Sequence, residues 1–244
     1  MGKNAYELRS LILKADDHIL AINKPAGLLS LPDGYDPDIP HLASLFEPEY
    51  GLLWMVHRLD QDTSGVVLMA RTAEAHRHLN DQFSNREVEK TYHAVVAGSP
   101  AWKELRVTQP LLIDADRKHR TVVHPQKGKP AATRLRAVER YGAYSLIEAK
   151  PETGRTHQIR VHLASQGLPI CGDSLYGRGE GVFLSKVKPG YKPGRGEERP
   201  LIARLALHAR RLAFTHPGTD QELVIEAPYP KDFESALRQL RKVG

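Results

Sequence analysis

Short apolar segments that end at turn residues recur along the chain, and few helical stretches separate them. Residues 133–139 alternate apolar with mainly basic side chains, which is typical of a strand with one buried face and a basic outer face. Residues 144–149 follow a Tyr-Gly turn and complete a predicted hairpin. This succession of strands favours an α+β fold with a largely antiparallel sheet.

The remaining predicted elements extend this pattern along the chain. Further strands are predicted at 18–23, 66–71, 91–98, 205–214 and 222–227. Three helices are predicted: one capped by Thr72 that ends near Arg86, one over 154–166, and one whose apolar face lies within 233–240. No internal repeat and no clean boundary divide these elements. We therefore expect a single domain over residues 1–244.

The composition excludes several classes of protein. The 244 residues are 41% hydrophobic and 26% charged, as in ordinary globular proteins. The single cysteine, Cys171, excludes a disulfide scaffold and a zinc site built on cysteine pairs. No apolar run approaches the ~20 residues of a membrane helix, and the N-terminal residues lack a signal-peptide pattern. We expect a cytoplasmic protein without a membrane partner.

The charge balance hints at an acidic partner. Lys and Arg number 35 against 29 Asp and Glu, a formal charge of +6, which alone is a weak signal. Residues 177–200 are rich in Gly and Pro, and residues 186–204 contain six Lys or Arg against two Glu. We expect this segment to be a long mobile loop.

Two polar motifs could carry chemistry. In His57–Gly65, Asp60 follows Arg58 and precedes a tight turn and a buried strand, so it is either an exposed reactive carboxylate or part of a surface ion pair. In Thr153–His162, Arg155 in a first helical turn would oppose the helix dipole, which suggests a compensating carboxylate or phosphate. The alternative for this second motif is a basic, solvated helix face.

A third motif, Lys90–Gly98, places Tyr92 in a predicted strand, as a core residue or as a platform for a planar substrate. Motifs for other chemistries are absent. The sequence has no P-loop, no Gly-x-Ser-x-Gly and no His-Glu-x-x-His, and the glycines at 177–181 follow no strand. We therefore expect neither a nucleotide cofactor nor a metal.

Five segments, in order and spacing, resemble the RluA-type pseudouridine synthases. They are NKPAG (23–27), HRLDQDTSG (57–65), KTYHAVVAG (90–98), ETGRTHQIRVHLASQGLPICGD (152–173) and LHA (207–209). The resemblance spans about residues 12–227. It implies an enzyme that isomerises uridine to pseudouridine in structured RNA without a cofactor. It also implies a mixed, mostly antiparallel sheet with flanking helices and a central basic cleft.

The resemblance assigns roles to individual residues. Asp60 matches the catalytic aspartate, and Arg155 matches the arginine that pairs with it and keeps it ionised. Tyr92 matches the tyrosine that stacks on the target base. Arg58 matches the residue that fills the space of the extruded nucleotide, because a stacked base hides its reactive atoms. Further substrate-contact candidates, on weaker grounds, are Lys24, His57 and Leu207.

Substrate choice stays open at this stage. NKPAG begins at residue 23, so we expect the small form of the family, without the S4-like RNA-binding domain of many relatives. RNA would then be held by a monomeric catalytic domain, with the basic loop 177–200 either a clamp or a floppy surface segment. Ribosomal RNA and transfer RNA are both candidates. Alternatives are an RNA-binding or folding protein on this scaffold, and a glycoside-type hydrolase that uses Asp60.

Overall fold

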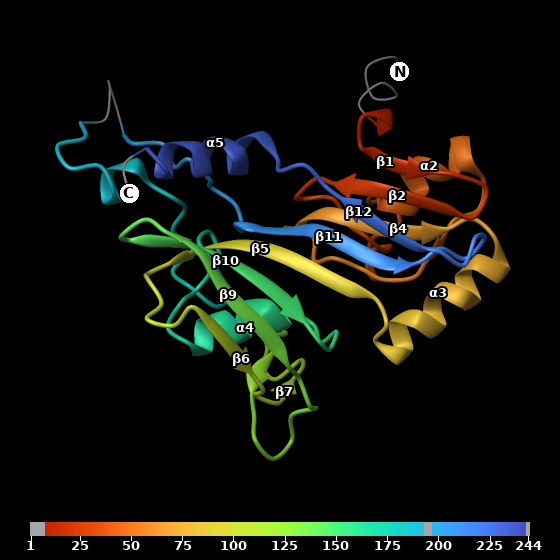
Figure 1. The fold of residues 1–244 in the computed structure, drawn as a ribbon, viewed down its shortest axis with the longest axis horizontal. Coiled ribbons are helices and arrows are strands. Elements are labelled where there is room, and N and C mark those ends of the chain that lie inside the picture. Colours follow the sequence, from red (N-terminus) through yellow and green to blue (C-terminus); the bar gives the residue numbers. More distant parts are fainter. Residues whose placement is uncertain (1–7, 193–196, 243–244) are drawn as a thin grey trace. The chain divides into compact units, whose positions relative to one another are not determined.

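The chain forms two compact units, and each is described by itself (Figure 1). The structure is a computed structural model that describes residues 8–192 and 197–242. Unit 1 comprises Met1–Lys90 and Ala209–Pro228, and unit 2 comprises Thr91–His208 and Tyr229–Gly244. The expectation of one catalytic domain over 1–244 stays a prediction.

Unit 1 is built on strands that lie in the order β1-β2-β4-β11. The strands are β1 (Ile12–Ala15), β2 (Ile19–Lys24), β3 (Trp54–Met55), β4 (Ser64–Ala70), β11 (Leu207–Thr215, in unit 1 from Ala209) and β12 (Glu222–Glu226). The pairs β1–β2, β2–β4, β3–β4 and β11–β12 are antiparallel. All seven residues of β4 are buried, as expected for the continuous apolar run in the sequence.

Two helices accompany these strands, α2 (Leu42–Tyr50) and α3 (Ala73–Asn85). The predicted cap of α3 is confirmed, because the Thr72 side chain accepts a hydrogen bond from the Ala75 amide at 3.1 Å. Ala75 and Leu79 of α3 share a buried cluster with Val66 and Leu68 of β4. The helical spacing of these side chains therefore fixes α3 on the sheet.

Unit 2 contains a second run of antiparallel strands in the order β5-β10-β9-β6. These are β5 (Glu89–Ala97, in unit 2 from Thr91), β10 (Tyr144–Pro151), β9 (Thr133–Arg140) and β6 (Glu104–Val107). The predicted β9–β10 hairpin and the basic outer face of β9 are confirmed: Arg134 and Arg136 are exposed, while Thr133 and Leu135 are buried. Strands β7 (Leu111–Leu112) and β8 (Val122–Val123) form a separate pair.

The helices of unit 2 are α4 (Gln158–Ser165), α5 (Lys231–Leu240) and the 3-10 turn η1 (Leu184–Lys186). The predicted helix over 154–166 begins too early, because His157 is the N-cap and has left-handed backbone angles. Arg155 therefore precedes the helix. The apolar face predicted for α5 is confirmed, with Phe233, Leu237 and Leu240 buried.

The segment 177–200 is anchored by a bridge between a residue near its start and a residue just after its end. Val182 and Ile202 form an antiparallel bridge, and both side chains are fully buried. Residues 193–196 of the expected loop lie outside the described residues. Taken together, the elements confirm an α+β protein with a mixed, mostly antiparallel sheet. Within residues 8–192 and 197–242, no helix is both long and apolar enough to cross a membrane.

Candidate active site

The predicted site residues are carried by both units. Those of unit 1 are Lys24, His57, Arg58 and Asp60, and those of unit 2 are Tyr92, Arg155 and Leu207. Their surroundings are therefore described in two parts.

Asp60 opens a tight turn that leads into β4. The Thr63 amide donates to the Asp60 carbonyl oxygen at 3.0 Å and closes this turn. Gly65, at the start of β4, has a φ of +118°, and a Cβ there would lie 2.2 Å from the Ala209 carbonyl oxygen. Only glycine fits this contact with β11. The Gly of the motif thus serves the packing that places the turn.

The residues on either side of Asp60 are tied to the segment 27–30. The Ser30 hydroxyl donates to the Leu59 carbonyl at 2.9 Å and accepts from the Leu59 amide at 3.2 Å. On the other side, the Gly27 amide donates to the Gln61 carbonyl at 2.9 Å, and the Gln61 side chain donates back to Gly27 at 3.2 Å. Asp60, which is partly exposed, sits between two fixed neighbours.

Lys24 supplies a third anchor for this turn. Its residue exposure is 0%, and its ammonium donates to the carbonyls of Pro25, Leu28 and Gln61 at 3.1, 2.7 and 2.8 Å. A buried charge is tolerated when hydrogen bonds replace its hydration, and these carbonyls do so. The burial favours a positioning role for Lys24 over the predicted contact with substrate.

His57 joins the motif to the sheet and to α3. Its Nε2 atom accepts a hydrogen bond from the Leu68 amide at 2.9 Å, and its ring stacks on Phe83 at a centroid distance of 4.9 Å. Burial, with a smaller effect of the Lys90 charge, lowers the pKa of His57 to about 3. The ring is therefore neutral at pH 7. Arg58, by contrast, is exposed and can be reached from solvent.

Tyr92 and Leu207 belong to the apolar interior of unit 2. Tyr92 is a partly buried residue of β5 that pairs with Ala149 of β10 and packs against the main core cluster. Leu207, the first residue of β11, is a member of that cluster and is only 3% exposed. The structure thus assigns the two predicted base contacts to the same cluster.

Arg155 lies in a turn that precedes α4. Its amide donates to the Gln158 side chain at 3.1 Å, and its Nε donates to the Pro130 carbonyl at 3.2 Å. Arg155 lies two residues before the N-cap His157, so the argument from a cation within the first helical turn does not apply. That argument for a compensating anion was wrong, and the assignment of Arg155 rests on the motif alone.

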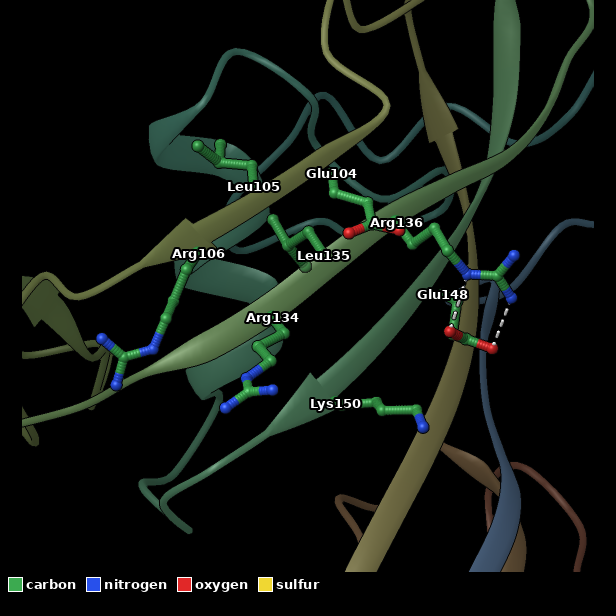
Figure 2. A pocket seen from close by; sticks show the side chains of 8 residues that line it. All are labelled: Glu104, Leu105, Arg106, Arg134, Leu135, Arg136, Glu148 and Lys150. Atoms are coloured by element: carbon green, nitrogen blue, oxygen red, sulfur yellow. Dashed lines mark hydrogen bonds and ion pairs between the residues drawn. The ribbon is translucent and has the colours of Figure 1, made fainter.

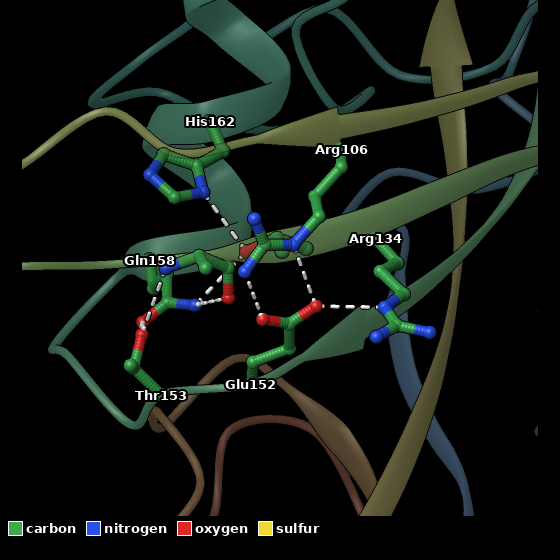
Figure 3. A network of polar contacts seen from close by, with 8 residues as sticks. Arg106, Arg134, Glu152, Thr153, Gln158 and His162 are labelled. Atoms are coloured by element: carbon green, nitrogen blue, oxygen red, sulfur yellow. Dashed lines mark hydrogen bonds and ion pairs between the residues drawn. The ribbon is translucent and has the colours of Figure 1, made fainter.

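Gln158, which sequence reasoning did not single out, organises the turn that carries Arg155 (Figure 3). Its side-chain oxygen accepts from Thr153 Oγ1 at 2.7 Å as well as from Arg155, and its nitrogen donates to Ala132 and Thr133 at 2.9 Å each. His162 also bonds the Thr133 hydroxyl at 2.9 Å, and burial lowers its pKa. The Gln side chain thereby ties the turn to β9.

A buried ion pair follows in the same motif. Arg160 donates through Nε and Nη2 to Asp173 at 2.8 and 2.9 Å, and the Asp173 side chain is fully buried. Burial raises the pKa of Asp173, but the Arg160 guanidinium and two backbone amides outweigh it and leave the pKa lowered. Sequence reasoning missed this pair, although both members lie within the quoted motif 152–173.

Metal ligands do not gather at these positions. In the part of the chain that the structure describes, no group of three or more His, Cys, Asp and Glu side chains is placed to hold a metal ion. What unit 1 offers chemically is a partly exposed carboxylate on a turn fixed on both sides, beside an exposed arginine.

Sequence comparisons match this chain to pseudouridine synthases. A family model described as RNA pseudouridylate synthase matches residues 18–165. Ribosomal large subunit pseudouridine synthase C of Escherichia coli strain K12 is 39% identical over 236 residues, which cover 96% of this chain and 71% of that protein. The same enzyme of Vibrio vulnificus is 37% identical over 238 residues, which cover 96% and 70%.

Solved structures agree with the sequence comparisons. Human RNA pseudouridylate synthase domain containing 4 superposes with a TM-score of 0.73 at 26% identity, covering 97% of this chain and 95% of that one. Human RNA pseudouridylate synthase domain containing 1 has a TM-score of 0.69 at 23% identity and covers 94% of both chains. The second similarity speaks for the fold alone.

Proposed function

This chain belongs to the RNA pseudouridylate synthase family, in its RluA-type branch, and we propose that it isomerises uridines of ribosomal RNA with Asp60 as the catalytic residue. The observation that carries the role of Asp60 is its setting. It is a partly exposed carboxylate whose two neighbours are both hydrogen-bonded to the segment 27–30. A reacting group gains from such preorganisation, because little motion has to be frozen during the reaction.

The reaction breaks the bond between uracil N1 and ribose C1′ and forms a bond between C5 and the same C1′. The C5 proton leaves and N1 gains a proton, so the composition of the RNA is unchanged. Breaking the first bond develops positive charge on the sugar, which a nearby carboxylate stabilises. Asp60 either attacks C1′ or removes a ribose proton to give a glycal-like species.

We assign roles to the other predicted site residues from their contacts in the structure and from the motif. Tyr92 stacks on the target base, with Leu207 as part of the same apolar wall. Arg58, exposed beside Asp60, occupies the space that the extruded nucleotide leaves. Lys24 and His57 act by positioning the turn, since the Lys24 ammonium and the His57 Nε2 atom bind backbone groups of unit 1.

We propose Arg155 as the arginine that keeps Asp60 ionised, and Arg160, which lies in the same segment, as the matched comparison. The motif match designates Arg155, which is partly exposed and precedes α4. Arg160 is buried against Asp173. Matched Arg155→Lys and Arg160→Lys variants assign the role, because lysine keeps the charge but loses the bidentate geometry. We expect the variant of the pairing arginine to shift the pH profile of turnover.

Ribosomal RNA is the substrate class we propose, because the relatives quoted above are named for the large ribosomal subunit. Transfer RNA is the competing substrate. A monomer that works in the cytoplasm is part of this proposal. An RNA-binding or folding role without turnover is the alternative function.

The test uses total RNA labelled with tritium at uridine C5, incubated with wild type and with Asp60→Asn. We expect wild type to release tritium to water and the variant to lose more than about 10³-fold of this activity with its fold intact. Tritium release by Asp60→Asn would contradict the assignment of Asp60. Binding without release by wild type would favour the alternative function, and free uracil among the products would indicate hydrolysis.

A further inference from the structure

A row of three cations crosses the outer surface of the unit 2 strands. Arg106 of β6 pairs with Arg134 of β9, and Arg134 pairs with Lys150 of β10. Residues that are directly opposite in antiparallel strands project to the same side, so the three side chains lie next to one another. They border a hollow of about 320 Å³ (Figure 2). Arg106, Arg134 and Lys150 together form the cationic row.

The cationic row lies on the sheet face opposite to Tyr92. Tyr92 pairs with Ala149, which in turn pairs with Leu135 of β9. Successive residues of a strand point to opposite faces, so Lys150 and Arg134 project away from the face of Tyr92. The Tyr92 face is the one that α4 covers, since Gln158 bonds Thr133, which shares the side of Leu135. Within unit 2, the cationic row therefore lies on the face opposite to the predicted base contact Tyr92.

Like charges directly opposite on neighbouring strands destabilise a sheet, so this row needs compensation. Glu152 supplies part of it (Figure 3): Arg106 binds both of its oxygens at 2.9 and 2.6 Å, and Arg134 donates through Nε at 2.7 Å. The two arginines lower the pKa of Glu152 to about 2, which keeps the carboxylate charged. Glu104, Glu148 and Arg136 also line the hollow, so with Glu152 three carboxylates face four cations, and a smaller excess of positive charge remains.

Arg134 is the member best placed to bind a further anion. Its side chain is 71% exposed, against 55% for Arg106, which uses two nitrogens on Glu152. Figure 3 marks a single contact of Arg134 with Glu152, made by its Nε atom. A guanidinium with an open edge, beside a cross-strand ammonium, matches the geometry of a phosphate.

We propose that the cationic row binds the sugar-phosphate backbone of the RNA substrate, with Arg134 and Lys150 as phosphate contacts, on the face of unit 2 opposite to Tyr92. The proposal rests on the proposed function, because it takes the RNA to be the enzyme's own substrate. It implies that a large, folded RNA is held at two faces, whereas a short RNA is held at one.

The chain offers a matched control in Arg136. It lies two residues from Arg134 on the same strand and face and is 45% exposed, but its Nε and Nη2 atoms both donate to Glu148, at 3.0 and 2.9 Å, so its charge is matched by a bidentate ion pair. Arg134→Gln, Lys150→Gln and Arg136→Gln therefore remove one positive charge each from the same surface. Only the first two remove a proposed phosphate contact.

The experiment measures the binding of a fluorescein-labelled RNA stem-loop to the full chain, over a range of salt concentrations. We expect Arg134→Gln and Lys150→Gln each to weaken binding about eightfold at 0.1 M salt and to flatten the salt slope by about 0.7–0.9. Arg136→Gln should leave the slope near that of wild type. Equal effects of Arg134→Gln and Arg136→Gln, or wild-type binding by Arg134→Gln, would overturn the proposal.

Glu152→Gln is expected to change RNA binding in the opposite direction. Removing the carboxylate that competes for Arg134 should tighten RNA binding about threefold and steepen the salt slope by up to one contact. If the row only stabilises the sheet, this variant lowers the melting temperature and leaves binding unchanged, which contradicts the proposal. Tritium release from total RNA labelled at uridine C5 is followed in parallel. No release by wild type would count against the proposed function, whereas the salt slopes report on the cationic row alone.

Discussion

The turn that carries Asp60 and the turn that carries Arg155 are held in place by different means. The Asp60 turn is fixed by partners from residues 24–30, among them a fully buried ammonium. The Arg155 turn is fixed by one neutral amide, Gln158, which bonds residues on both sides of the turn and two residues of unit 2 near the start of β9. In both turns, neighbouring residues of the motif hold one predicted site residue in place, Asp60 in the first turn and Arg155 in the second.

The difference has an energetic consequence. A charged donor contributes more per hydrogen bond than a neutral amide, and Lys24 makes three such bonds to carbonyl oxygens. We therefore expect the Asp60 turn to be the more sensitive of the two to the loss of its central anchor.

Lys24→Met tests the stronger anchor. Methionine has a similar length but no donor, so the carbonyls of Pro25, Leu28 and Gln61 lose the bonds that Lys24 supplied. We expect the free energy of unfolding, measured by urea denaturation, to fall by about 3 kcal/mol. A fall of less than about 1 kcal/mol would show that the turn does not depend on this ammonium.

Gln158→Met is the corresponding change in the other turn. It leaves the Ala132 carbonyl, the Arg155 amide and two hydroxyls without this amide. Because these bonds are neutral, we expect a smaller loss, about 2 kcal/mol, with a lower turnover number. The same urea titration, run beside that of Lys24→Met, decides the order. A larger loss for Gln158→Met would reverse the comparison.

The smallest expected effect concerns pH. His57 has a folded-state pKa of about 3, below its ordinary value near 6.5, so the unfolded chain binds more protons between these values. Stability from this group is therefore present at pH 7 and is lost as pH falls. We expect about 1 kcal/mol of loss from pH 7 to 5.5, and a smaller loss in His57→Gln. Identical pH dependence in both proteins would contradict this.

The strands and the apolar helices could be predicted because their signal is local. The alternation of Leu135 with Arg134 and Arg136 places β9 with one face buried, and the spacing of Phe233, Leu237 and Leu240 fixes the buried face of α5. Periodicity of this kind needs no knowledge of distant residues. It is also the reason that the fold class could be stated from the sequence.

The details of the site depend on contacts that no local pattern records. The turn before α4 takes its shape from bonds between Gln158 and two residues some 25 positions earlier, so the helix start was misplaced. Helix α2 was missed, and it contains a proline at position 48. The burial of Lys24 could not be predicted either, because a lysine in a sequence shows its charge but not its exposure; its contact with substrate stays a prediction.

The way unit 1 is assembled from two separated stretches has a consequence for how the protein is made. Its strands β11 and β12 come from Ala209–Pro228, and Gly65 of β4 packs against Ala209. A contact between positions so distant is slow to form, because a long loop must close first. During synthesis the Asp60 turn would leave the ribosome long before β11 exists to pack against it. The emerging chain therefore completes the packing of the Asp60 turn late, after most of unit 2 has already been made.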